Sequence, residues 1–260
     1  MAAASVAAVT LAASVAVAAG FALDDAFSAL QSSTIMRDVQ NSSCEKLAPG
    51  EKIVYFIRHG EAMNNLGDHN IDEHMRDAPL TQRGKEQATQ LRHKKLLSDA
   101  LGGNTSHRVQ LIVASPMMRT LETALLAFND MTAPRPSWVL SAVIREGDPD
   151  VPTWLCNYGD DNKGQQLIRK YQRMDLLMQY HALPLGWSEN TGYYKCTVPQ
   201  VQKRFHDFKR WLLTRPESRI IVLTHGKIMY LATGARLGNC GILPVRMNSR
   251  GDLHPFKSEC

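Results

Sequence analysis

Cysteine is scarce in this sequence, and the few cysteines are not arranged for cross-linking. The 260 residues include five cysteines, an odd number, and no two of them form a C-x-x-C pair. They lie far apart along the chain, at Cys44, Cys156, Cys196, Cys240 and Cys260. This spacing argues against a disulfide framework and against a cysteine zinc site. The thiols are therefore expected to be structural or incidental.

Concentrated charge is also missing. Charged residues make up 21% of the sequence, and the formal net charge is only +5. The densest basic stretch, Arg92 to Lys95, falls on an expected helix, where it forms a solvated face. We therefore expect no nucleic-acid partner. The hydrophobic content of 44% is typical of a soluble globular protein with a large core and without extensive disorder.

The beginning of the chain lacks charge altogether. Residues 2–23 contain no charged side chain and are dominated by alanine and valine. A stretch of this length can cross a membrane or form the apolar part of a secretory signal, although no basic residue precedes it. The first arginine is Arg37, which argues against a mitochondrial transit peptide. The sequence leaves open a secretory signal, membrane association through residues 1–23, or an Ala-rich extension of a cytoplasmic protein.

We divide the chain into an N-terminal segment with a linker, residues 1–48, and a folded domain, residues 49–260. Pro49-Gly50 supplies a turn, and the apolar run that follows it predicts a buried strand. This strand ends abruptly in Arg58, His59 and Gly60. In open α/β sheets, ligands bind outside the carboxyl ends of the strands, so these residues stand where a site is expected.

Further strands alternate with helices along the rest of the domain. We expect strands at 109–114, 137–144 and 219–223, and helices at 82–97, 117–128, 165–180, 198–213 and 227–237. Thr81 and Ser115 are the expected N-caps of the first two helices. No strong pattern follows Pro244. The alternation predicts a mainly parallel central sheet flanked by helices, a three-layer α/β sandwich.

The segment from about 147 to 195 is expected to form a cap insert over the site. Its helical part carries an apolar stripe that predicts core or lid packing, formed by Leu167, Tyr171, Met174 and Met178. The stretch 186–194 is predicted to be a loop with exposed aromatic residues. The insert holds five aromatic side chains that could contact a ligand or pack among themselves: Trp154, Tyr158, Trp187, Tyr193 and Tyr194.

Polar side chains follow each of the four predicted strands. Arg58 and His59 follow the first strand, Arg119 lies in the helix after the second, Glu146 follows the third and His225 follows the fourth. Because the carboxyl ends of parallel strands meet at one edge, these residues should converge. Two arginines offer bidentate donors that suit phosphate oxygens and disfavour a divalent metal at the same spot. The expected ligand is a phosphoryl group.

Four sequence blocks carry a resemblance to a known family. They are Arg58-His59-Gly60-Glu61 with Asn65, Asp77-x-Pro79-Leu80-Thr81-x-x-Gly84-x-x-Gln87-Ala88, Ser115-Pro116-x-x-Arg119-Thr120-x-x-Thr123-Ala124, and Thr224-His225-Gly226. In this order they resemble the motifs of the histidine phosphatase superfamily, the phosphoglycerate-mutase-like proteins. The stretch 186–217 is similar to the eukaryotic phosphatase-like branch. The resemblance runs from about Lys52 to Leu237 and implies the three-layer fold of that family.

The resemblance also implies roles for the residues at the strand ends. His59 is expected to be the nucleophile that becomes phosphorylated, and Glu146 the proton donor to the leaving oxygen. The residues expected to hold the phosphoryl oxygens are Arg58, Arg119 and His225, with Asn65 nearby. Splitting phosphoryl transfer through a covalent intermediate needs positioning and charge stabilisation, and this set can supply both. No metal or cofactor is expected. The nucleophilic imidazole must be neutral, so its other nitrogen should donate to a carbonyl or carboxylate oxygen.

The proton donor is the role with competing candidates. Glu146 is preferred because it directly follows a predicted strand. The rival carboxylates close in sequence are Asp148, Asp150 and Glu61. The glycolytic mutases of the family have Arg-x-Tyr-Gly after the acid, whereas here the stretch 147–150 reads Gly-Asp-Pro-Asp. Lys227 follows the second histidine motif and could add phosphate affinity or face solvent.

These residues predict an enzyme, a histidine acid phosphatase-like phosphomonoesterase. Its substrate is expected to be a small phosphorylated molecule, with a phosphoprotein left open, and water accepts the phosphoryl group from His59. Phosphoglycerate mutase is the alternative within the same chemistry. A non-catalytic scaffold that binds phosphorylated ligands is the alternative from another class, although binding alone needs neither a nucleophile nor an acid. The sequence does not indicate an oligomeric state.

Overall fold

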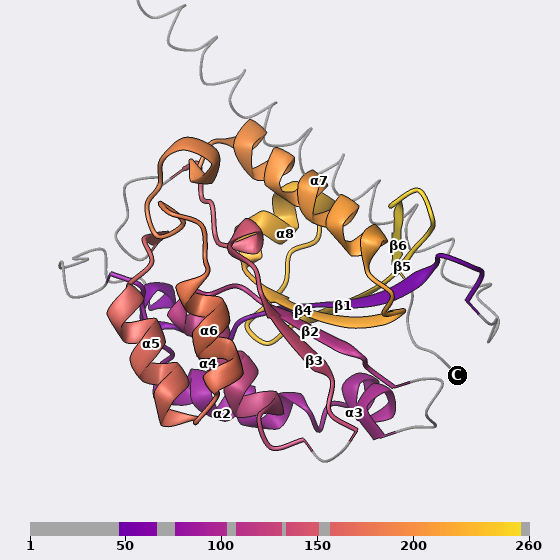
Figure 1. Ribbon diagram of the computed structural model, residues 1–260, viewed down its shortest axis with the longest axis horizontal. Coiled ribbons are helices and arrows are strands. Elements are labelled where there is room, and N and C mark those ends of the chain that lie inside the picture. Colours follow the sequence, from indigo (N-terminus) through magenta and orange to yellow (C-terminus); the bar gives the residue numbers. More distant parts are fainter. Residues whose placement is uncertain (1–46, 67–75, 103–107, 132–133, 151–156, 256–260) are drawn as a thin grey trace, which may run out of the picture. The chain divides into compact units, whose positions relative to one another are not determined.

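A six-stranded sheet forms the centre of the computed structural model, which describes residues 47–66, 76–102, 108–131, 134–150 and 157–255 (Figure 1). Its strands are β1 at Lys52–Arg58, β2 at Leu111–Ala114, β3 at Ser137–Leu140, β4 at Arg219–Thr224, β5 at Ile242–Met247 and β6 at Leu253–Pro255. They lie in the order β3-β2-β4-β1-β5-β6. The first four strands along the chain are therefore contiguous neighbours in the sheet, and β5 and β6 extend it beyond β1.

The pairing of the strands brings their carboxyl ends together. β1 runs parallel to β4, and β2 runs parallel to both β3 and β4. In the register of the first pair, Arg58 lies opposite Thr224. The residues that follow them, His59 and His225, are consequently placed side by side at the same edge. The predicted convergence of the first and fourth strand ends is thus built into the register of the sheet.

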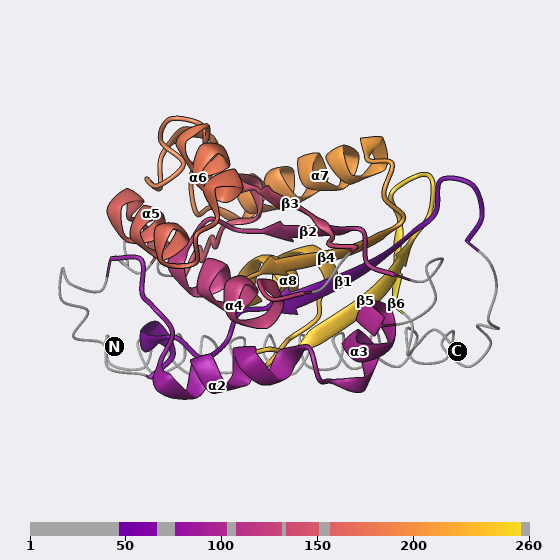
Figure 2. The same cartoon turned by 60° about the horizontal axis from the view of Figure 1, so that its bottom comes forward.

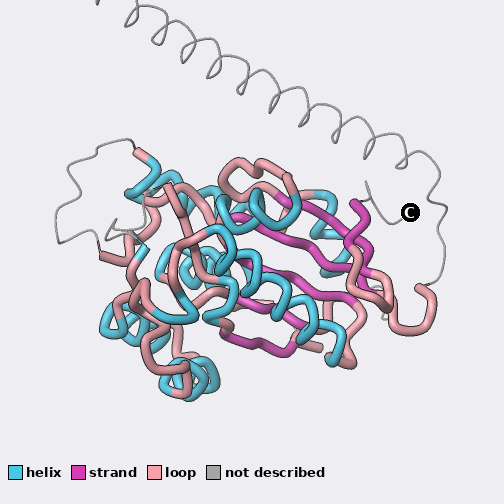
Figure 3. Tube along the Cα trace, turned by 90° about the horizontal axis from the view of Figure 1, so that it is seen from above, coloured by secondary structure: helices cyan, strands magenta, loops and turns pink. Residues whose placement is uncertain are grey.

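Helices cover both faces of the sheet. They are α2 at Gln82–Leu91, α3 at Lys95–Gly102, α4 at Met118–Phe128, α5 at Asp161–Lys170, α6 at Met174–His181, α7 at Val198–Thr214 and α8 at Gly226–Thr233, with 3-10 helices η2 at Met63–Asn65, η5 at Ala142–Ile144 and η7 at Gly192–Tyr194. Buried residues of α7 and α8 share a core with one face, and those of α3 to α6 share a core with the other. Figure 3 shows the strands lying between these helices. The predicted three-layer sandwich is confirmed.

The alternation of side chains along β1 explains why this strand reads as a continuous apolar run. Val54 and Phe56 belong to the core under α7 and α8, whereas Ile53, Tyr55 and Ile57 belong to the opposite core. None of these five side chains is more than 2% exposed. A strand that is covered on both faces has no solvent-exposed face for polar side chains, and parallel strands of this kind are strongly hydrophobic.

The last two strands were not expected from the sequence. β5 pairs antiparallel with β1, and β6 pairs antiparallel with β5 (Figure 2). In β5 the side chains of Ile242, Leu243 and Pro244 are only partly buried, and Pro244 cannot donate a backbone hydrogen bond. The strand therefore lacks a clear apolar alternation, and its pairing with a segment almost 200 residues earlier carries no local signal.

Two predicted helices are each broken in two. The helix expected at 82–97 ends at Leu91, and α3 begins at Lys95, because the polar turn between them has no apolar side chain to continue the buried stripe. The helix expected at 165–180 is divided between α5 and α6, where Gln172 adopts a left-handed conformation with φ of 54°. Each break lets both halves present buried residues to the core.

The helix ends near the site also differ from expectation. α4 is capped by Met117 rather than Ser115, because the Ser115 hydroxyl lies against His225. β3 ends at Leu140, and residues up to Ile144 form η5, because the neighbouring strand β2 ends after four residues. α8 ends at Thr233 rather than 237, because Gly234 takes a left-handed C-cap with φ of 74°.

Some side chains of the insert that were expected to be buried are exposed, and some that were expected to be exposed are buried. Met174 and Met178 are 61% and 73% exposed, so the predicted methionine packing is wrong. Trp187 and Tyr194 were expected to be exposed, but both are buried. The ring of Trp187 meets Tyr180 edge to face at 5.7 Å between centroids, which places it in the main core. These two aromatics therefore pack within the protein.

Several predictions concern residues outside the described ranges. The N-terminal segment up to residue 46 is among them, as are Trp154 and Cys156 of the insert. The described residues, which lie between 47 and 255, belong to one compact unit. Among the helices that the structure describes, none has the length and apolar character needed to cross a bilayer.

Candidate active site

His59 is the central residue of the candidate site and is held in one orientation. It follows β1 directly, and its side chain is only 2% exposed. Its Nδ1 lies 2.7 Å from the carbonyl oxygen of Gly60. A carbonyl can only accept, so Nδ1 must carry the proton and the lone pair must be on Nε2. The expected distal donation to a backbone carbonyl is therefore present, and Nε2 is the nitrogen that can attack.

Two glycines allow the turn after His59 to be tightly packed. A Cβ on Gly60 would lie 2.6 Å from the carbonyl oxygen of Gly84, and a Cβ on Gly84 would lie 1.9 Å from the carbonyl oxygen of Glu61. Both approaches are shorter than any side chain permits. Thr81 caps α2 by accepting from the backbone nitrogen of Gly84, as predicted. The motif around α2 thus holds the chain that carries His59.

His225 stands beside His59 in the site. The two rings meet edge to face with 5.2 Å between their centroids. His225 is fully buried, and its Nε2 is 3.0 Å from the Ser115 hydroxyl. Its Nδ1 has no hydrogen-bond partner among the described residues. A buried polar atom without a partner costs free energy, so Nδ1 is well suited to donate to a bound anion.

Two arginines bring fixed positive charge to the histidines. Arg58 ends β1, and its Nη1 donates to the carbonyl oxygen of Leu237 at 2.8 Å. Gly226 leaves room for it, because a Cβ there would lie 3.1 Å from Arg58 Nε. Arg119 lies in the first turn of α4 and is fully buried. Burial is the main cause that lowers the pKa of Arg58, and Glu146 opposes it.

The electrostatic environment keeps both histidines neutral. Burial lowers the pKa of His59 well below its usual value of 6.5, and the charges of Arg119 and Arg58 lower it further. Burial likewise lowers the pKa of His225 well below its usual value, again with Arg119 as the largest charge effect. A neutral imidazole is nucleophilic, so the arginines that can bind a phosphoryl group also keep His59 able to attack it.

Glu146 lies at the N-terminal end of α8. Its carboxylate oxygens accept from the backbone nitrogens of Ile228 at 3.3 Å and Lys227 at 3.5 Å, and its side chain is 8% exposed. It follows η5 rather than a strand, so the reason for preferring it was wrong although it still reaches the site. The rival Glu61 points elsewhere, since it accepts from the Thr81 hydroxyl at 2.8 Å.

The other two rival carboxylates are bound to Lys227. Lys227 Nζ pairs with Asp150 and lies 3.6 Å from Asp148. These carboxylates raise the pKa of Lys227, against the lowering effect of burial, which is the largest single cause. The lysine side chain therefore does not face solvent freely, because these two carboxylates engage it. It ties the loop after Glu146 to the start of α8.

A cleft of about 330 Å³ opens over these residues. Arg58, His59, Glu146 and Asn65 line it, together with Lys227 and other residues of α8 and the loop after it. The structure therefore brings the six predicted site residues together, with the buried Arg119 and His225 behind the lining. Their catalytic roles remain predictions.

The loop after α8 contributes contacts that the sequence did not suggest. Cys240 donates its backbone N–H to the carbonyl oxygen of His59 at 3.1 Å. Asn239 Nδ2 donates to Asn65 Oδ1 at 3.1 Å, which fixes the amide of Asn65. Thr123 accepts from the backbone nitrogen of Gly60 at 3.0 Å. Thr123 belongs to a recognisable motif, whereas Asn239 and Cys240 lie in a stretch with no pattern that could have identified them.

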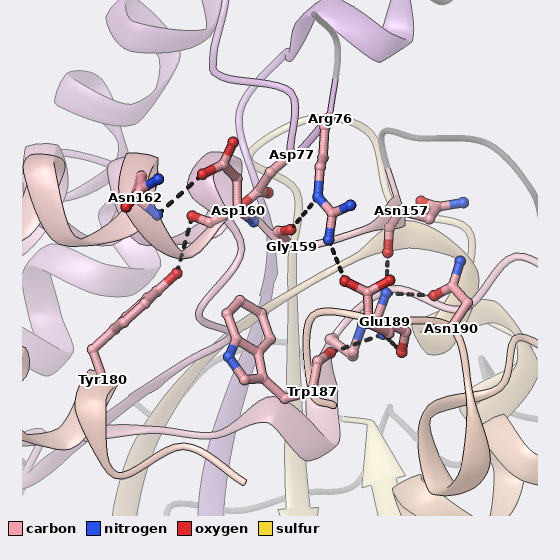
Figure 4. Close-up of polar contacts among 11 residues, drawn as sticks. Arg76, Asp77, Asn157, Gly159, Asp160, Asn162, Tyr180, Trp187, Glu189 and Asn190 are labelled. Atoms are coloured by element: carbon pink, nitrogen blue, oxygen red, sulfur yellow. Dashed lines mark hydrogen bonds and ion pairs between the residues drawn. The ribbon is translucent and has the colours of Figure 1, made fainter. Parts of the chain in front are cut away.

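Asp77 joins the start of α4 to the insert. It is fully buried with φ of 50°, and its Oδ1 accepts from Met118 N at 2.9 Å. Its Oδ2 accepts from Asp160 N at 3.1 Å, and Figure 4 shows Asp77 beside Asp160. Burial raises the pKa of Asp77 to about 6, although the charge of Arg119 opposes this. This carboxylate therefore fixes the helix turn that carries Arg119.

Comparisons with known proteins find phosphatases and phosphoglycerate mutase-like proteins among the relatives of this chain. Residues 54–140 match the family model of the histidine phosphatase superfamily (branch 1). Phosphoglycerate mutase-like protein 1 of Arabidopsis thaliana is 27% identical over 216 residues, which are 73% of each chain. A probable phosphatase of Schizosaccharomyces pombe is 28% identical over 179 residues, 68% of this chain and 74% of that one.

The solved structure of mycobacterial hydrolase 1 has the same fold, with a TM-score of 0.51 and 15% identity over 81% of this chain and 99% of that one. Over residues 54–140 the chain matches the histidine phosphatase superfamily, in line with the resemblance of its motifs. This match and the names of the relatives support a phosphatase or a related phosphoryl-transfer enzyme.

Proposed function

We propose that the protein hydrolyses phosphomonoesters without a metal, through a phosphohistidine intermediate on His59. The observation that carries this proposal is the bond from His59 Nδ1 to the carbonyl oxygen of Gly60, which leaves Nε2 with the lone pair. Nε2 attacks phosphorus, and the bond from phosphorus to the leaving oxygen breaks. Glu146, entering protonated, gives its proton to that oxygen.

The second half of the reaction reverses the role of Glu146. Its carboxylate takes a proton from water, whose oxygen attacks phosphorus and breaks the bond to Nε2. Inorganic phosphate leaves, and His59 is again neutral. Arg58, Arg119 and His225 hold the phosphoryl oxygens through both steps, and Asn65 lies nearby. Positioning and charge stabilisation of this kind account for most of the catalysis in phosphoryl transfer.

The cleft volume of about 330 Å³ suits a small phosphorylated substrate. A phosphorylated side chain of a protein is a larger substrate with the same phosphomonoester group. Transfer to a second hydroxyl, as in a mutase, needs the first product to stay bound, and the loop after Glu146 lacks the Arg-x-Tyr-Gly residues of the glycolytic mutases. Hydrolysis is therefore the first expectation.

The test is phosphate release by the full chain from a panel of phosphomonoesters, including p-nitrophenyl phosphate, with a chelator present. We expect release from at least one ester and its loss in His59→Ala. His206→Ala, which removes an exposed histidine of α7, is the control and should keep full activity. Retained release in His59→Ala contradicts the covalent mechanism. If no ester releases phosphate but 3-phosphoglycerate is isomerised, the protein is a mutase and not a hydrolase. If neither reaction occurs, the protein is a non-catalytic binding protein.

A further inference from the structure

The short helix η5 delivers Glu146 to the site, and its carbonyl groups need donors. It ends at Ile144, and the last carbonyl oxygens of a helix have no partner within the helix. The Thr224 hydroxyl donates to the carbonyl oxygen of Ile144 at 2.8 Å. The carbonyl oxygens on either side both accept from Nη1 of Arg204, at 3.1 Å for Val143 and 3.0 Å for Arg145. One side chain from α7 thus satisfies two backbone groups just before the acid.

Arg204 is an unusual residue for its place in the helix. It lies on the buried stripe of α7 with Val201, Phe205 and Phe208, and its side chain has no exposed surface. Its two hydrogen-bond acceptors among the described residues are neutral carbonyls, and none of the described carboxylates forms a salt bridge with it. Burial lowers the pKa of Arg204. An unpaired buried cation costs stability, so packing alone does not explain why an arginine stands here.

The residue after the acid is adapted to this arginine. A Cβ on Gly147 would lie 2.6 Å from Arg204 Nη2 and 2.5 Å from Cγ2 of Val201. Gly147 therefore lets Val201 and Arg204 of α7 lie close against the backbone just after Glu146, and a side chain at this position would have to displace them.

The side chain of Arg145 provides a separate anchor in the opposite direction. It is fully buried and donates to the carbonyl oxygens of Trp187 and Glu189, both at 2.9 Å, to Asn190 Oδ1 at 2.6 Å, and to the carbonyl oxygen of Asn157. Figure 4 shows these four acceptors gathered in one place. Arg145 thus ties the chain before Glu146 to the insert, while its own carbonyl is held by Arg204.

We propose that Arg204 is a positioning residue that sets the orientation of the Glu146 carboxyl for proton transfer. It acts through the backbone of residues 143–147 and does not touch the phosphoryl group. This inference rests on the proposed role of Glu146 as the proton donor. Its consequence is specific: loss of Arg204 should impair esters that need a protonated leaving oxygen and should spare esters that do not.

The test compares kcat/KM for an alkyl phosphate and for p-nitrophenyl phosphate, because kcat/KM reports the step in which the leaving group departs. The variants are Arg204→Met, Arg204→Lys and Glu146→Gln, with Arg210→Met as a control that removes an exposed arginine of the same helix. Displacing a catalytic group by about 1 Å can cost about 100-fold. We expect Arg204→Met to lose about 100-fold on the alkyl ester and less than about threefold on the nitrophenyl ester.

Two further results separate positioning from a general structural role. Arg204→Lys keeps a cationic donor for the two carbonyls and should recover part of the alkyl-ester rate; it also replaces Arg204→Met if that variant does not fold. The double variant Arg204→Met with Glu146→Gln should be no slower than Glu146→Gln alone, because both changes remove the same effect. Vanadate affinity should stay unchanged, since the phosphoryl-binding residues are intact.

Equal losses on both esters, or no loss on either, overturn the inference. A further loss in the double variant also overturns it. If Glu146→Gln itself shows no preference between the esters, the proposed acid role fails and the inference fails with it. If Glu146→Gln shows the preference and neither Arg204 variant does, only the positioning role is lost.

Discussion

The two neutral histidines should make the fold sensitive to mild acid. In the unfolded chain a histidine takes up a proton near pH 6.5, whereas burial and the neighbouring arginines hold the pKa of His59 and His225 well below this value in the folded protein. A group whose pKa is lower when folded favours the unfolded state as the pH falls below the unfolded value. The free energy of unfolding should therefore be highest above about pH 7 and should decrease as the pH falls below 6.5.

The expected size follows from the shift. One pKa unit corresponds to about 1.4 kcal/mol, so at pH 5.5 each neutral histidine lowers the free energy of unfolding by about 1.4 kcal/mol, or about 2.8 kcal/mol together. Asp77 acts in the opposite direction, because its pKa is raised to about 6 and it takes up a proton in the folded state. This protonation raises the free energy of unfolding by about 0.8 kcal/mol at pH 5.5. The net loss between pH 8.0 and pH 5.5 should be about 2 kcal/mol.

Urea unfolding of the full chain at pH 8.0, 6.5 and 5.5 measures this loss. His59→Gln and His225→Gln should each remove about 1.4 kcal/mol of the pH dependence. His206→Gln, on the exposed surface of α7, is the control and should leave it unchanged. A free energy of unfolding that is flat between pH 8.0 and 5.5 refutes the reasoning. So does a wild-type slope that persists in both His59→Gln and His225→Gln, because the proton uptake would then come from elsewhere.

Two other substitutions test the packing around the site. Gly84→Ala should lower the free energy of unfolding by about 3 kcal/mol, because its Cβ would lie 1.9 Å from the backbone oxygen of Glu61. Gly238→Ala, where no atom lies within 4 Å of the new Cβ, is the matched control, and equal losses in urea unfolding contradict the packing argument. Lys227→Met should change the same free energy by less than about 1 kcal/mol, because its ion pairs are partly exposed to solvent; a loss of several kcal/mol means that they are not screened.

The sequence predicts those parts of the fold whose residue pattern lies within a single strand, helix or motif. β1 is buried on both faces, so its apolar run is continuous, and α7 keeps an apolar stripe at helical spacing over its length. The site motifs follow strand ends that meet at one sheet edge. Gly60 and Gly84 show a further reason why motifs are recognisable: each position tolerates only one residue type because backbone atoms approach too closely.

The parts that escaped prediction depend on distant partners. β5 pairs with β1, which lies almost 200 residues earlier, and Trp187 is buried because Tyr180 and the main core lie beside it. Periodicity could not locate the break at Gln172, since the apolar spacing continues across it. Arg204 did leave a signal in the sequence, as a cation on the apolar face of a predicted helix. Its partners are backbone carbonyls, which no residue pattern reveals.

The arrangement of charge explains why this site uses both arginine and histidine. Arginine keeps its proton far above neutral pH, so Arg58 and Arg119 can be buried and still offer positive charge to a phosphoryl group. Histidine responds in the opposite way, because burial and nearby cations drive its proton off. In the proposed mechanism, the same two arginines therefore bind the phosphoryl group and keep Nε2 of His59 free for attack. If one arginine were replaced by a neutral residue, the affinity for the phosphoryl group should fall and the pKa of His59 should rise. The pH below which activity is lost should therefore rise as the affinity falls.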